Sequence, residues 1–158
     1  MIEIGPALAA LTGGGVEFIV IGGVAATIHG SARLTRDIDI VYRRTDENIT
    51  RLVATLQPLD PYLRGAPPGL PFHFDAKTVR AGLNFTLTTS LGDLDLLGEV
   101  AGGGAYEALL AHADERQVYG VRIRCVDLPT LIHLKRSAGR PKDLEAIAEL
   151  EKLRLAGG

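Results

Sequence analysis

The run from Val16 to Ile21 places the strongest limit on the fold, because it is mostly apolar, rich in β-branched residues and only long enough for a strand. A strand of this kind is buried and needs other elements to cover it. Gly22-Gly23 follows at once, and the small-residue segment 24–29 then predicts a short helix. A buried strand that turns directly into a helix is typical of α/β proteins.

The rest of the chain alternates in the same way, which predicts one α/β (α+β) domain over residues 1–158 with a mixed β-sheet flanked by helices. Residues 58–71 hold five of the eight prolines and predict a surface loop near the functional site. Further strands are expected at 37–42, 83–89, 94–100 and 118–126. Helices are expected at 3–12, 46–56 with Asp46 as its cap, 105–112, 128–138 with Asp127 as its cap, and 141–155.

Composition narrows the class of protein. The net charge is −2 and the pI is about 6.1, which argues against binding nucleic acid through bulk charge but leaves a local basic site open. The lone Cys125 lies in an apolar alternation, so we expect a buried strand residue rather than a reactive thiol. No signal peptide and no membrane-spanning apolar run is recognisable, so we expect a cytoplasmic protein without a membrane partner.

Asp37 and Asp39 stand two positions apart in segment 37–42, which alternates polar and apolar residues. Alternate residues of a strand project from one face, so the two carboxylates lie close together and repel each other. A divalent cation between them removes that cost, and Mg²⁺ prefers hard oxygen ligands. A solvated acidic face on a half-exposed strand is the alternative. Ile38 and Ile40 favour a buried strand and therefore a metal site.

Gly22-Gly23 lies upstream of this acidic pair, between a buried strand and a helix. Glycines at such a position let the backbone approach a phosphate, and a helix N-terminus offers free N–H groups. A simple tight turn is the alternative. The position of the glycines before the Asp pair favours a phosphate-binding role.

A strand ending in Gly22-Gly23, a short helix and an Asp37-X-Asp39 strand together resemble the DNA polymerase β-like nucleotidyltransferase superfamily. The resemblance implies the nucleotidyltransferase fold with C-terminal helices, and a third carboxylate on a neighbouring strand. Asp95 is the candidate for that carboxylate, because it lies inside an apolar run; Asp93 is expected at the strand start as a turn residue.

Further segments are similar to the bacterial branch that contains AbiEii-type toxins and related minimal nucleotidyltransferases. Aminoglycoside and lincosamide nucleotidyltransferases share the Gly-Gly and Asp-X-Asp elements, so the resemblance is less specific for the substrate. The segments that carry it are Arg33-X-Thr35-X-Asp37-Ile38-Asp39, Asp127-Leu128, Leu131-Ile132-X-Leu134-Lys135 and Gly139-Arg140-X-Lys142-Asp143-Leu144.

Three other side chains are candidates for nucleotide binding. Arg33 could hold phosphate oxygens in a fork, pair with the nearby acids or lie in solvent. Thr35 could orient the strand start by hydrogen bonding or simply favour β structure. By resemblance, Lys135 could reach the triphosphate; a surface lysine near a helix end is the alternative. Arg140 and Lys142 are expected to organise the helix junction, with Asp143 as a partner.

The resemblance implies a nucleotidyltransferase enzyme that binds a nucleoside triphosphate and two Mg²⁺ ions, with Mn²⁺ as a substitute. Asp37, Asp39 and Asp95 would hold the metals and carry out catalysis, with Asp95 as the base toward the acceptor hydroxyl. The acceptor classes left open are tRNA, a protein and a small molecule. The alternative function is a binding module with the same fold that acts with a cognate partner protein in a toxin–antitoxin or phage-defence system.

Overall fold

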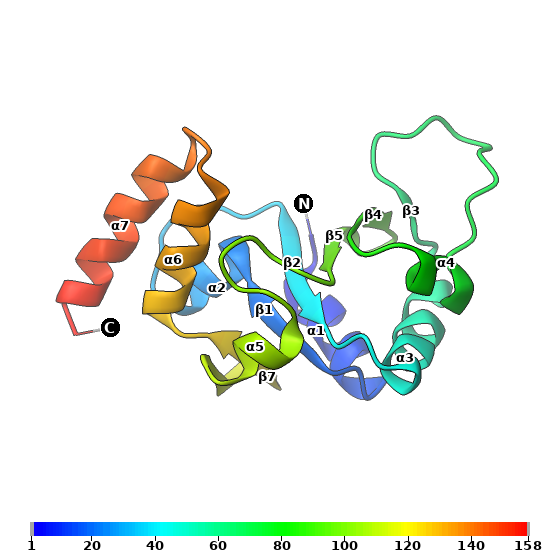
Figure 1. Ribbon diagram of the computed structural model, residues 1–158, viewed down its shortest axis with the longest axis horizontal. Helices are drawn as coiled ribbons and strands as arrows, with labels where there is room; N and C mark the ends of the chain where they lie inside the picture. The colour runs from blue at the N-terminus through cyan, green and yellow to red at the C-terminus, as the bar shows by residue number, and fades with distance from the viewer. Residues whose placement is uncertain (1, 158) are drawn as a thin grey trace.

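A computed structural model describes residues 2–157 as a seven-stranded mixed sheet flanked by helices (Figure 1). The strand order is β3-β4-β5-β2-β1-β7-β6. The expected fold class is therefore confirmed. The strands are β1 (Phe18–Ile21), β2 (Asp37–Tyr42), β3 (Tyr62–Leu63), β4 (Phe85–Thr89), β5 (Gly92–Leu97), β6 (Ala113–Val118) and β7 (Val121–Val126).

The centre of the sheet is its most buried part. Every residue of β1 is buried, as the apolar run predicts. β1 pairs antiparallel with β2 and parallel with β7, and β2 pairs parallel with β5. Ile38 and Ile40 of β2 are fully buried on one face of the sheet. The residues that alternate with them, Asp37 and Asp39, therefore point to the other face.

Residues 2–157 also form seven α-helices and one 3₁₀ turn. Asp127 caps α6 as expected, because its Oδ1 accepts a hydrogen bond of 2.9 Å from the Thr130 N–H. The helices are α1 (Ile4–Gly13), α2 (Gly22–Ile28), α3 (Asp46–Leu56), the 3₁₀ turn η1 (Gln57–Leu59), α4 (Ala76–Ala81), α5 (Tyr106–Leu110), α6 (Leu128–Ala138) and α7 (Asp143–Leu155).

Two parts of the molecule project on either side of the central sheet (Figure 1). Helices α6 and α7 lie side by side at one end, joined by a tight turn in which Gly139 has a φ of 66°. A long loop after β3, residues 64–75, projects at the other end. Glu149 of α7 fixes the first of these parts, because it accepts hydrogen bonds from the Ser31 hydroxyl (2.6 Å) and the Ala32 N–H (3.2 Å).

Several predicted boundaries are wrong in detail. The cap of α3 is Thr45, whose Oγ1 accepts a bond from the Asn48 N–H, and Asp46 is the first helical residue. The strand expected at 118–126 is present from Val121 as β7, but Tyr119 and Gly120 both take positive φ angles and reverse the chain, so that β7 forms a hairpin with β6. Strand β6 and helix α4 were not expected, since neither has a clear apolar repeat.

The segment 58–71 is largely the expected surface loop, but it also contains part of η1 and the two-residue edge strand β3. Cys125 is buried in β7, and burial raises its pKa to about 12, in agreement with an unreactive core thiol. Within residues 2–157, no helix combines the length and the apolar character needed to cross a membrane.

Candidate active site

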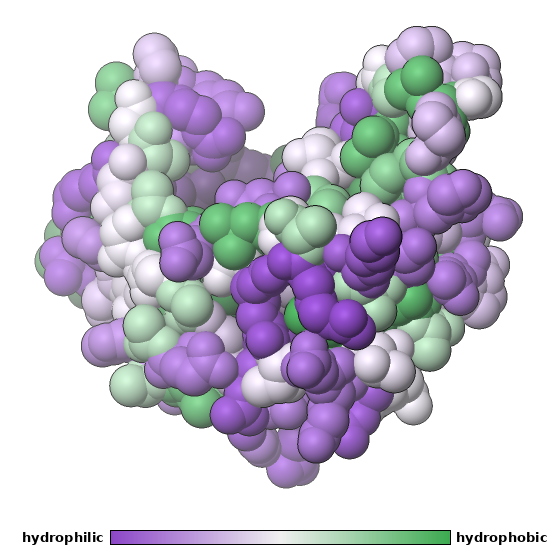
Figure 2. All heavy atoms as spheres, turned by 45° about the vertical axis from the view of Figure 1, so that its right-hand side comes forward, coloured by the Kyte–Doolittle hydropathy of each residue, from purple (hydrophilic) through white to green (hydrophobic). Residues whose placement is uncertain are grey.

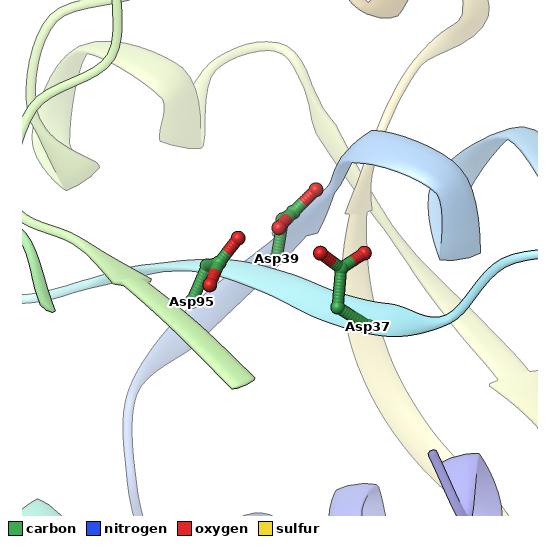
Figure 3. Close-up of side chains that lie close together, drawn as sticks. All are labelled: Asp37, Asp39 and Asp95. Carbon is green, nitrogen blue, oxygen red and sulfur yellow. The ribbon is translucent and has the colours of Figure 1, made fainter. Parts of the chain in front are cut away.

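Three carboxylates converge on one face of the sheet. Asp37 and Asp39 project from β2, and Asp95 projects from the adjacent strand β5, directly opposite Asp39 in the register (Figure 3). One oxygen of each side chain lies within 4.8 Å of the others. Sheet register produces this cluster, because residues paired across parallel strands point to the same face. The predicted geometry of Asp95 is therefore confirmed.

Asp95 does not pair with Arg122 or Arg124, the two basic residues of β7. Arg122 instead forms an ion pair with Glu115 across the β6–β7 hairpin. Arg124 donates to the Tyr106 hydroxyl at 3.3 Å. β7 lies beyond β1 in the sheet and does not adjoin β5.

Asp93 shares the face of Asp95 but not its place in the cluster. It lies at the start of β5, as expected, but it is a strand residue and not a turn residue, because the β4–β5 turn is made by Ser90 and Leu91. Its register partner is Asp37, and this pair lies two residues along the strands from the Asp39–Asp95 pair. Asp93 therefore borders the cluster without completing it.

The strongest polar contact of the cluster comes from a residue that sequence reasoning missed. Arg64 lies just after β3, and its Nη2 donates to Asp95 Oδ1 at 2.7 Å and to the Leu87 carbonyl at 2.8 Å. The same guanidinium lies 3.7 Å from Asp37 Oδ2 and 3.3 Å from Asp93 Oδ2. Nothing in the proline-rich segment points to this contact, since it depends on the pairing of β3, β4 and β5.

The carboxylates have unusual electrostatics. Burial, a hydrogen bond with Asp95 and the charges of Asp37 and Asp95 raise the pKa of Asp39 to about 8 from an ordinary value of 3.8. Burial and the charge of Asp95 also raise the pKa of Asp37, against the opposing effect of Arg64. In the absence of a cation the cluster therefore retains a proton at neutral pH.

Gly22 and Gly23 bring the start of α2 against these acids. Gly22 has a φ of +68°, and a Cβ there would overlap the Asp39 carboxylate. A Cβ on Gly23 would lie 2.7 Å from Thr35 Oγ1. Both glycines line the cleft above the carboxylates. The glycines are thus needed for the close approach of α2 to β2, whatever they contact in a bound ligand.

Thr35 takes the strand-orienting role. Its hydroxyl donates to the Asp37 carbonyl at 2.9 Å, and it packs against Gly23. It does not contribute to the lining of the cleft. Thr35 therefore acts on the site through the start of β2.

A cleft of about 540 Å³ lies between the carboxylates and helices α6 and α7. Figure 2 shows the molecule hollowed between two projecting arms. Apolar residues from β5, α2 and α6 form part of the lining. The basic residues that line the cleft are Arg33, Lys135, Arg140 and Lys142.

These basic groups differ in how firmly they are paired. Arg140 binds Asp143 with both a 2.8 Å and a 3.3 Å contact, and Asp143 is only 4% exposed. Burial acts to raise the pKa of Asp143, but the hydrogen bonds from Arg140 and the charges of Arg140 and Lys135 together outweigh it, and the pKa lies below its ordinary value. The predicted Arg140–Asp143 junction is confirmed. Arg33 pairs only loosely with Glu145, at 3.7 Å, and Lys135 forms no ion pair with a described residue.

The arrangement can bind a divalent cation and a polyanion together. Clustered carboxylate oxygens are hard ligands that suit Mg²⁺ or Mn²⁺. The basic groups across the cleft can neutralise phosphate oxygens. The residues fit such an ion, because one oxygen from each of Asp37, Asp39 and Asp95 lies within 4.8 Å of the others and all three residues line the cleft.

No protein-family model and no curated protein sequence matches the chain. Solved structures do match it. The lincomycin-bound lincosamide antibiotic adenylyltransferase LnuA aligns with a TM-score of 0.62 and 15% identity, over 96% of each chain. ANT(2")-Ia in complex with adenylyl-2"-tobramycin aligns with a TM-score of 0.55 and 16% identity, over 97% of this chain and 93% of that one.

A solution structure of the antibiotic-resistance factor ANT(2'')-Ia aligns with a TM-score of 0.51 and 15% identity, over 98% of this chain and 91% of that one. These likenesses extend over nearly the whole chain rather than over one motif. At such low identity they concern the fold and not the reaction. This chain therefore has the nucleotidyltransferase fold.

Proposed function

We propose that this chain is a metal-dependent nucleotidyltransferase, which moves a nucleoside monophosphate from a nucleoside triphosphate to an acceptor hydroxyl. The observation that carries the proposal is the convergence of Asp37, Asp39 and Asp95 within 4.8 Å at the base of a cleft with basic side chains on its other wall. A merely solvated acidic face would not bury Asp39 against α2 or raise its pKa to about 8.

The carboxylates would hold the metal. Asp37 and Asp39 would bind the ion that accompanies the nucleotide, and Asp95 would join them at a second ion. When bound, Mg²⁺ or Mn²⁺ would supply charge stabilisation for the phosphoryl oxygens and a lower pKa for the acceptor hydroxyl.

The other residues would position the triphosphate. Lys135 lies close enough to Asp39 to oppose the rise of its pKa, so its ammonium group can face both the carboxylates and a nucleotide. Arg33 and Lys142 line the same cleft. Gly22 and Gly23 would let the phosphates approach the backbone at the start of α2.

The transfer would take place at the α-phosphorus of the nucleoside triphosphate. The acceptor oxygen forms a bond to the α-phosphorus, the bond from that phosphorus to the bridging oxygen breaks, and pyrophosphate leaves. Asp95 accepts the proton of the acceptor hydroxyl.

The acceptor is a hydroxyl on a small molecule, a tRNA or a protein. The titles of the matching structures name lincomycin and adenylyl-2"-tobramycin, which makes small antibiotics the first compounds to test. An AbiEii-type role in a toxin–antitoxin or phage-defence system, with a cognate partner protein, rests on the sequence resemblance alone and comes second.

The test is incubation of the purified chain with each labelled nucleoside triphosphate, Mg²⁺ and either antibiotics or cell extract, followed by identification of the labelled species. Asp39→Asn is the inactivating variant. Asp114→Asn, an exposed strand aspartate in β6, is the matched control. Metal-dependent labelling that only Asp39→Asn abolishes supports the enzyme. Failure to bind any nucleotide, with tight binding to a co-expressed protein, supports a binding module instead.

A further inference from the structure

Arg64 is the first residue of the loop 64–75, and its side chain reaches the carboxylate cluster. Its guanidinium lies 2.7 Å from Asp95, 3.3 Å from Asp93 and 3.7 Å from Asp37. Within residues 2–157, no other basic side chain comes within 4.0 Å of these carboxylates. A single positive charge therefore serves three acids, and Asp39 has no basic partner at this distance.

This pairing is incomplete. Arg64 Nε is buried and has no hydrogen-bond partner, although Asp93 lies near it. By contrast, Arg43 donates at 2.8 Å to Glu17 and at 3.0 Å to Glu107, and Arg140 holds Asp143 with two nitrogens. A permanent structural arginine is normally satisfied in that way. Arg64 can therefore neutralise the acids through its charge, but its Nε–H lacks the hydrogen bond that a fully satisfied ion pair would give it.

We propose that Arg64 is a displaceable counter-ion of the metal site: it neutralises the carboxylates when no metal is bound, and Mg²⁺ expels it. The proposal rests on the proposed function, since it requires that the cluster binds a metal. A guanidinium and a divalent ion on the same carboxylates repel each other strongly in a partly buried site. Oxygens of Asp37 and Asp95 that bind the metal are also drawn away from Arg64.

The displacement would reach the loop. Arg64 is the first residue of segment 64–75, and its side chain ties that segment to Asp95 and to the Leu87 carbonyl. Tyr62 of β3 holds the middle of the loop, because its hydroxyl donates to the Pro67 carbonyl and accepts from the Leu70 N–H at 3.2 Å. Displacement of Arg64 would therefore free the first residues of the loop, while Tyr62 still holds its middle. The loop projects at the end of the sheet opposite α6 and α7 (Figure 1), so the freed residues would lie on the side of the carboxylates away from those helices.

The first experiment is titration of the full chain with Mg²⁺ and with Mn²⁺ by calorimetry. Arg64→Gln should bind either ion roughly tenfold more tightly than the wild type, because a competing charge has been removed. Arg122→Gln removes the same charge on β7, where Arg122 pairs with Glu115, and is the matched control. It should bind like the wild type. Equal or weaker binding by Arg64→Gln would mean that Arg64 only holds the ligands in place, and would overturn the proposal.

The second experiment needs no variant of Arg64. Trypsin must take the arginine side chain into its own pocket, so cleavage of the Arg64–Gly65 bond reports release of the guanidinium. Mg²⁺ should accelerate that cleavage in the wild type and leave it unchanged in Asp39→Asn, with cleavage after the exposed Lys152 as the internal reference.

The outcomes separate the two proposals. If the wild type binds neither ion, the proposed function and the role of Arg64 both fail. If the wild type binds metal but the Arg64–Gly65 bond stays protected, the displacement of Arg64 is wrong while the metal site stands.

Discussion

The acidic wall of the cleft comes from two adjacent strands, whereas the basic wall comes from helix α6, the turn that follows it and the loop before β2. On the acidic wall, the Asp39–Asp95 register fixes the spacing of the carboxylates. On the basic wall, Arg33 precedes β2, Lys135 belongs to α6, and Arg140 and Lys142 lie in the turn between α6 and α7, where Arg140 has Asp143 as its own partner.

The difference shows where charge is held rigidly and where it can adapt. A carboxylate on a central strand cannot move away from its neighbours, so repulsion is stored until a proton or cation relieves it. A lysine or arginine on a helix end can follow a ligand at small cost. Substitutions on the acidic wall should therefore remove function, and those on the basic wall should weaken it by degrees.

The largest effect is expected for Asp39→Asn. It should abolish metal-dependent nucleotide binding and lower turnover by at least about 100-fold, since a lost metal ligand removes several kcal/mol of charge stabilisation. Nucleotide binding with and without Mg²⁺ is the measurement. The Asp114→Asn control should behave like the wild type. Normal activity of Asp39→Asn would mean that the acidic wall is only a solvated face.

The next effect is expected for Gly22→Ala. A Cβ would overlap the Asp39 carboxylate, and the positive φ adds strain of about 1–2 kcal/mol. Metal affinity should fall by roughly 10- to 100-fold, as expected when a residue that orients a ligand is lost. Gly15→Ala is the control, because Gly15 has a φ of +72° but its Cβ would meet only Arg51 Cδ at 3.6 Å. Equal loss of metal binding in both variants would point to general destabilisation.

A smaller effect is expected for Lys135→Met on the basic wall. Nucleotide affinity should fall about tenfold with little change in metal affinity, because one exchangeable phosphate contact is lost. Arg140→Met is the contrasting variant: it should mainly lower the melting temperature, by about 3–6 °C, since it leaves the buried Asp143 unpaired. Titration with nucleotide and thermal unfolding distinguish the two. A large stability loss for Lys135→Met would contradict the division of roles.

The smallest effect concerns pH. The folded pKa of Asp39, about 8, lies above its ordinary value of 3.8, so the protonated form is favoured by folding. The stability that the folded protein gains from protonation of Asp39 is fully present below pH 3.8 and is lost as the pH rises through about 8. Without metal, the melting temperature should therefore decline toward pH 8. Asp39→Asn should flatten this part of the curve, and saturating Mg²⁺ should reverse it in the wild type. A flat wild-type curve would show that Asp39 is not buried as described.

Local patterns predicted much of the acidic wall. Alternation from Asp37 to Tyr42 marks both the strand and the shared face of Asp37 and Asp39, because side chains of a strand alternate. The preference for Asp95 over Asp93 came from its place within an apolar run. The hairpin of β6 and β7 was missed, since most of β6 is exposed and charged and carries no apolar repeat.

Spacing along the chain determined which acids share a face, where the glycines allow α2 to begin, and which helices carry the basic residues. Only the tertiary structure decided that Arg64 neutralises the carboxylates, because β3 must pair with β4, and β4 with β5, before that side chain can reach them. It also decided that Asp39 keeps a proton near neutral pH, since burial and the distance to Asp95 are properties of the packed sheet. Periodicity is local and is written in the sequence, whereas electrostatic environment depends on contacts between segments that are distant along the chain.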